Sequence, residues 1–61
     1  MTPDKAALMA LAEHHDRQGV FHAKQAASNA SWYHGHAADT RRAADHFAVA
    51  AALKARAGEA A

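Results

Sequence analysis

The sequence predicts an all-α protein, an antiparallel two-helix hairpin that pairs with a second copy into a dimeric four-helix bundle. Alanine, the strongest helix former, accounts for 20 of the 61 residues. Small and apolar residues recur at helical spacing on both sides of one segment rich in serine, asparagine and glycine, where the chain is expected to reverse. A chain of this length without cysteine has little core and no disulfide, so we expect one domain, residues 1–61, that associates with another chain.

The first helix is expected over residues 3–30. Thr2 is a suitable N-cap, Pro3 suits the first helical position, and Asp4 places an acid near the positive end of the helix dipole. Gly19 indicates either a bend or an uninterrupted helix with a second contact flank, and we favour the uninterrupted helix because no other turn-forming residue accompanies it. At about 100° per residue, the face expected to contact the second helix carries Leu8, Leu11, Ala12, His15, His22, Ala26, Asn29 and Tyr33.

A turn is expected over residues 31–38 and a second helix over residues 39–57. The segment before the second helix has the composition of a helix end and a turn. Asp39 suits a cap or a first-turn acid, and basic residues followed by Gly58 suit a helix end. The residues expected to face the first helix are Ala43, either His46 or Phe47, Ala50, Leu53 and Ala57.

Large apolar side chains are scarce in this chain. Hydrophobic residues make up 51% of the sequence, but 20 of them are alanine and only 11 are larger. Alanine favours helix yet fills little space, so an isolated hairpin can bury little apolar surface. The sequence therefore predicts a homodimer, in which partner surface completes the core.

The charge balance argues against strongly charged partners. Seven basic and six acidic residues give a formal net charge of +1, which favours neither nucleic acid nor an acidic membrane. No apolar run approaches the ~20 residues of a membrane-spanning helix, and the amino terminus lacks the pattern of a signal peptide. We expect a cytoplasmic protein without a membrane partner.

Six histidines are the most unusual feature of the composition. Helical metal sites usually present His or acid pairs at i,i+3 or i,i+4, and no two histidines here have either spacing. Unless the fold gathers them, we expect no metal or other cofactor, and interpret them as hydrogen-bonded or solvated. His15 and His22 lie on the expected contact face, so acidification toward about pH 5 should destabilise the protein if they are buried and neutral.

No catalytic site is expected. A nucleophilic triad needs a hydroxyl beside a histidine and an acid, and a thin hairpin has no cleft that excludes water. The three glycines do not cluster into a phosphate-binding loop. The chain is therefore predicted not to be an enzyme.

Protein recognition has positive support from the aromatic residues. Aromatic side chains are enriched at interface hot spots, and the expected partner-binding residues are His14, Phe21, Trp32 and Tyr33. Trp32 could equally close the end of the intrachain core. One alternative is a His-based metal-binding helical protein. The other is a dimeric nucleic-acid-binding hairpin, which the Rop-type plasmid regulators resemble in architecture and length. Its candidate phosphate-binding residues are Arg41, Arg42, Lys54 and Arg56.

Three segments carry a further resemblance: Leu11-Ala12-Glu13-His14-His15, Ser31-Trp32-Tyr33-x-Gly35 and Arg42-Ala43-Ala44-Asp45-His46-Phe47. In layout and composition the chain resembles small helical-hairpin accessory proteins of phages and prophages, including quorum-sensing anti-activators. This resemblance implies a homodimer that binds and disables a host protein such as a transcriptional regulator. We therefore expect a small regulatory or inhibitory protein-binding module.

Overall fold

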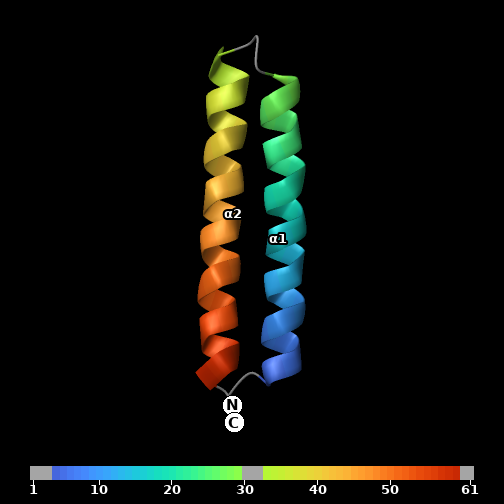
Figure 1. Cartoon of the computed structure of the whole chain (residues 1–61), viewed down its shortest axis with the longest axis vertical. Coiled ribbons are helices and arrows are strands. Elements are labelled where there is room, and N and C mark those ends of the chain that lie inside the picture. The colour runs from blue at the N-terminus through green and yellow to red at the C-terminus, as the bar shows by residue number, and fades with distance from the viewer. Residues whose placement is uncertain (1–3, 30–32, 60–61) are drawn as a thin grey trace.

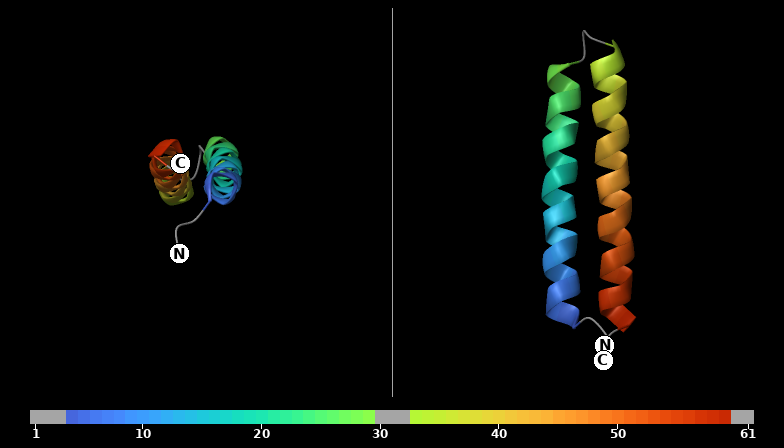
Figure 2. Two further views of the ribbon diagram at one scale, coloured as in Figure 1. Left: turned by 90° about the horizontal axis from the view of Figure 1, so that it is seen from below. Right: turned by 180° about the vertical axis from the view of Figure 1, so that it is seen from behind.

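Two long helices form the whole of the described structure. The computed structural model describes residues 4–29 and 33–59, which fold into α1 (Lys5–Ser28) and α2 (Tyr33–Glu59). The helices run antiparallel and lie side by side along their entire length, with no second layer on either face (Figures 1 and 2). The predicted all-α hairpin is confirmed. Neither helix is long and apolar enough to cross a membrane, within the residues described.

Asp4 is the N-cap of α1. Its backbone is extended, with φ −77° and ψ 161°, and its carboxylate accepts a hydrogen bond of 2.7 Å from the N–H of Ala7. The predicted cap, Thr2, is therefore wrong, because α1 begins at Lys5 and Asp4 itself satisfies one of the free N–H groups of the first turn. Thr2 and Pro3 lie outside the described residues.

Gly19 lies inside an unbroken α1, so the favoured prediction of an uninterrupted first helix is confirmed. Its role is close approach between the helices. A Cβ atom at this position would lie 2.6 Å from Cε1 of Phe47, so the absence of a side chain lets the Phe47 ring cover the backbone of α1. Gly19 is itself buried.

The predicted turn is wrong over residues 33–38, and so is the predicted start of the second helix at residue 39; residues 31 and 32 lie outside the described residues. The backbone is already helical from Tyr33, and Asp39 lies in the second turn of α2, where it faces α1 rather than capping a helix end. Gly35 is buried within this first part of α2. The helix also continues through Gly58 to Glu59, two residues beyond the predicted end, and no described glycine has a positive φ.

Small residues at every seventh position form the contact between the helices. This contact, which we call the seam, has buried small residues at Ala12, Gly19 and Ala26 of α1 and at Ala43, Ala50 and Ala57 of α2. Such a seven-residue repeat keeps one stripe of each helix facing the other, as in a coiled coil. The larger seam residues alternate with the small ones: Leu8, His15, His22 and Asn29 on α1, and Asp39, His46 and Leu53 on α2.

Two residues assigned to the contact face by sequence lie elsewhere. Leu11 is 47% exposed, because the seam uses Leu8 and Ala12 and leaves Leu11 at its edge. The open choice between His46 and Phe47 on α2 does not exclude either residue, because His46 lies in the seam and the partly exposed Phe47 ring packs on Gly19 of α1. Tyr33 belongs to α2 and therefore does not continue the stripe of α1.

Candidate functional site

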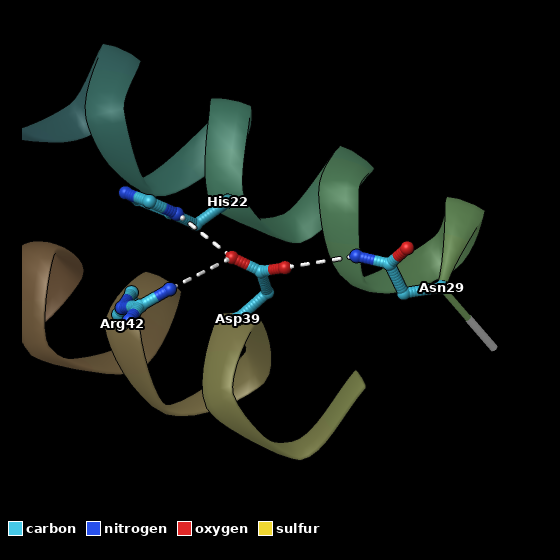
Figure 3. A network of polar contacts seen from close by, with 4 residues as sticks. All are labelled: His22, Asn29, Asp39 and Arg42. Atoms are coloured by element: carbon cyan, nitrogen blue, oxygen red, sulfur yellow. Dashed lines mark hydrogen bonds and ion pairs between the residues drawn. The ribbon is translucent and has the colours of Figure 1, made fainter. Parts of the chain in front are cut away.

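The half of the seam nearest the loop is polar and centres on Asp39. His22 Nδ1 lies 3.1 Å from Asp39 Oδ1, Asn29 Nδ2 donates to Oδ2 at 3.2 Å, and Arg42 of α2 lies 3.6 Å from Oδ1 (Figure 3). The hydrogen bond from His22 lowers the pKa of Asp39, and Asn29 and Arg42 add to this effect against the opposing effect of burial. Asp39 is therefore an ionised carboxylate that joins the two helices.

Three imidazole rings occupy the middle of the seam. His15 Nδ1 and His46 Nδ1 lie 2.9 Å apart, and the rings of His22 and His46 are stacked with centroids 5.5 Å apart and planes only 4° from parallel. Partial burial lowers the pKa of His46, and the neighbouring histidines His15 and His22 lower it further when they are charged. We call His15, His22 and His46 the histidine cluster.

His36 makes a different kind of contact. Its Nδ1 lies 2.9 Å from the backbone oxygen of Ala26, so its N–H donates to a carbonyl in the last turn of α1. The last carbonyls of a helix have no partner within that helix. His36 therefore ties the start of α2 to the end of α1.

The fold brings together histidines that no sequence spacing joins. Among residues 4–29 and 33–59, no group of three or more His, Asp or Glu residues is arranged to hold a metal ion. The hydrogen-bonded interpretation of His15 and His22 is confirmed by their contacts with His46 and Asp39. Sequence reasoning missed the partners His46 and Asp39, although both lie seven residues apart on the α2 stripe.

Large apolar side chains lie mostly outside the seam. Among the residues whose burial is described, 4–29 and 34–59, Leu8 is the largest buried side chain, at 7% exposure, and the other buried apolar residues are alanine. Five large side chains in these ranges are between 41% and 52% exposed, and we call them the apolar surface: Leu11, Val20, Phe21, Phe47 and Val49. The segment of α2 from His46 to Leu53 carries no Asp, Glu, Lys or Arg, so its outward side is also free of charge.

The predicted partner-binding residues have separate outcomes. His14 and Phe21 are both exposed on α1, and the rings of Phe21 and His22 lie edge to face with their centroids 5.2 Å apart. Trp32 lies outside the described residues, and Tyr33 is the first residue of α2. The sequence prediction missed Phe47 and Val49 as exposed groups, although the uncharged stretch around them was a usable signal.

The predicted phosphate-binding residues are partly engaged with carboxylates. Lys54 donates to Asp16 Oδ2 at 2.7 Å across the two helices, and Arg42 is paired with Asp39. Arg41 and Arg56 are exposed. Two of the four cations are therefore neutralised by partners within the hairpin.

Comparison of the chain with protein-family models, with curated proteins and with solved structures found no match. Two features of the hairpin itself bear on its function. One is the apolar surface, which makes contact with another molecule favourable. The other is the polar seam, which holds the hairpin closed.

Proposed function

We propose that this chain is a small, non-catalytic, cytoplasmic protein-binding module that homodimerises and acts on another protein in a regulatory or inhibitory role. The observation that carries the proposal is the placement of large and small side chains. In the described part of the chain, the interior consists mostly of alanine, glycine and partly buried histidine, with Leu8 and Asp39, whereas the five side chains of the apolar surface lie more than 40% exposed.

This placement favours association. Fully burying a side chain such as leucine or phenylalanine is worth ~1.5–3 kcal/mol, and these five residues are between 41% and 52% exposed, so about half of that gain is unused at each. Large apolar and aromatic side chains that stay exposed are often part of an interaction site. The uncharged segment from His46 to Leu53 supports the same conclusion, because a helix without charge on any side is typical of a buried helix.

The dimensions of the hairpin suit a second copy as one partner. The Cα atoms span 47 × 16 × 12 Å. The hairpin is therefore long and thin, and its broad side offers a second hairpin a contact along the full length of both helices. Two hairpins packed face to face would form a four-helix bundle, a common arrangement for symmetric dimers.

The resemblance to phage and prophage accessory proteins supports a host protein, such as a transcriptional regulator, as the target of the dimer. The nucleic-acid alternative has less support. Lys54 and Arg42 are paired with carboxylates, and the chain has a formal net charge of only +1. A nucleic-acid module usually shows a clear basic excess on one face.

Light scattering on the purified protein at micromolar concentration tests the dimer. We expect about twice the 6.4 kDa chain mass. Val49→Glu should shift the protein to monomer, because it places a charge on the apolar surface. Ala38→Glu is the matched control, since it adds the same carboxylate at an exposed α2 position outside the uncharged segment, and it should leave the dimer intact. A wild-type monomer, or equal effects of the two variants, would contradict the proposed dimer.

Capture from host lysate tests the target. Immobilised wild-type protein and Ala38→Glu should retain the same host protein, and Phe21→Glu should lose it because Phe21 is the most exposed residue of the apolar surface. Retention that does not change with Phe21→Glu would remove the apolar surface from the proposal.

A further inference from the structure

The histidine cluster limits how many protons the closed hairpin can hold. A hydrogen bond between two ring nitrogens needs one N–H group and one lone pair, so the contact of 2.9 Å between His15 Nδ1 and His46 Nδ1 requires at least one neutral ring. One proton added to the neutral pair is compatible with this contact and makes the hydrogen bond charge-assisted. A second added proton leaves an N–H donor on both facing nitrogens and a positive charge on both rings, so the hydrogen bond is lost.

The third ring adds to this limit. His22 is stacked near His46 with ring centroids 5.5 Å apart, and its Nδ1 is directed at Asp39, so a charge on His22 would lie close to the ring of His46. The His22 side chain is only 18% exposed. Solvent therefore screens this like-charge contact less than it would on an open surface.

The other charged groups around His46 do not compensate for the repulsion that a second added proton would create. From α1, His14 faces the cluster and would add a further positive charge; from α2, Asp45 has the opposite and smaller effect. Asp39 is committed to His22 and Asn29. Asp16, next to His15 in the sequence, is paired with Lys54.

We propose that the histidine cluster is a proton-sensitive latch: the hairpin closes with at most one proton on the His15–His46 pair, and the binding of a second proton opens the seam. The latch belongs to the single hairpin and does not depend on the identity of any partner. Through it the seam has a regulatory role, because mild acidification separates the helices and breaks up the surface that both of them build.

The direction of the effect follows from proton counting. Burial and the neighbouring histidines lower the pKa of His46, whereas the unfolded chain has free histidines that titrate near the ordinary value of 6.5. Below that pH the unfolded chain therefore binds more protons than the closed hairpin, so acidification favours opening. If the difference is one proton, the folding equilibrium constant falls by up to about tenfold per pH unit below that value.

His36 provides an internal contrast. Its ring donates to the backbone oxygen of Ala26, and a charged imidazole can make that hydrogen bond as well as a neutral one. His36 should therefore contribute to closing the hairpin at both pH values. It serves as the matched control because it is also a histidine that joins the two helices.

Urea unfolding followed by circular dichroism, at one protein concentration and with EDTA present, tests the latch. We expect the folding equilibrium constant of the wild type to fall severalfold between about pH 7.5 and about pH 5.5. The double variant His15→Leu/His46→Leu extends the apolar part of the seam and should lose most of this fall. His46→Gln, which keeps a polar side chain that does not titrate, should also reduce it and serves if the double variant misfolds.

His36→Gln should lower the folding equilibrium constant at both pH values. It should leave the ratio of that constant between the two pH values the same as in the wild type. The latch would be overturned by a wild-type stability that does not change between these pH values. It would equally be overturned if His46→Gln kept the whole fall, or if His36→Gln removed it.

Discussion

The two ends of the seam hold the same helices together by different means. Near the start of α1 and the end of α2, the seam contains Leu8, Leu53 and Ala57, and Leu8 and Ala57 are almost fully buried. Near the loop it contains His22, Asn29 and Asp39 in one hydrogen-bonded group (Figure 3). Apolar burial is indifferent to pH, whereas the polar group depends on its protonation state. One end therefore supplies constant stability and the other supplies stability that conditions can change.

Leu8→Ala should produce the largest loss, because Leu8 is the one large apolar side chain that is buried within residues 4–29 and 34–59. We expect a destabilisation of ~2–3 kcal/mol, at the lower end of the range for buried leucines because the site lies at the end of a thin hairpin. The free energy of unfolding from urea titration measures it. The loss should be equal near neutral pH and at mildly acidic pH, and a loss confined to one of them would contradict the assignment of this end as apolar and pH-independent.

Ala50→Leu tests how closely the helices approach in the seam between the two ends. Ala50 is 1% exposed, so a larger side chain must separate the helices, at a cost of ~1–3 kcal/mol. The control is Ala51→Leu, one residue along on the exposed side of α2, which should change the free energy of unfolding of the monomer by less than ~0.5 kcal/mol. Equal effects of the two variants would show that the seam is not closely packed.

Asp39→Asn should destabilise the hairpin near neutral pH by less than Leu8→Ala or Ala50→Leu does, since the amide keeps the shape and an acceptor oxygen for His22. Unlike theirs, its effect on stability should depend on pH. The lowered pKa of Asp39 means that its ionisation stabilises the fold at pH values above the ordinary 3.8, and that this stability is lost as the pH falls through the folded-state pKa. In an acid titration followed by circular dichroism, wild type and Asp39→Asn should therefore differ most above that range and converge below it. Parallel curves throughout would show that the charge on Asp39 does not stabilise the hairpin.

The sequence was sufficient for the hairpin and for most of the seam. Alanine content and the recurrence of Ala12, His15, His22 and Ala26 predict both the helix and its inward face, because these signals are local and periodic. The position of the turn was not predictable in the same way. Glycine, serine and asparagine between residues 28 and 36 are compatible with a turn, but Gly35 serves as a small residue inside α2.

The pairing of His15 with His46 could not be derived from sequence either. It depends on the alignment of the two helices, and a misplaced turn shifts that alignment. Asp39 shows the same difficulty, because an acid before a helical stretch is a reasonable cap until the helix is seen to begin six residues earlier, at Tyr33. Local chemistry alone does not distinguish a cap from a residue that contacts the neighbouring helix.

The regular repeat of small residues does not by itself determine the register of α2 against α1, and the polar residues of the seam do. Because Ala12, Gly19 and Ala26 on one helix and Ala43, Ala50 and Ala57 on the other are seven residues apart, sliding α2 by one repeat would again bring small residues face to face. The larger seam residues do not tolerate this slide: it would place His15 opposite Leu53 in one direction and Leu8 opposite His46 in the other. A buried histidine would then face a leucine without a hydrogen-bond partner, which is costly. The histidines and Asp39 thus specify one register of the two helices among several that the small residues alone would allow. A single polar residue specifies the register of a coiled coil in the same way.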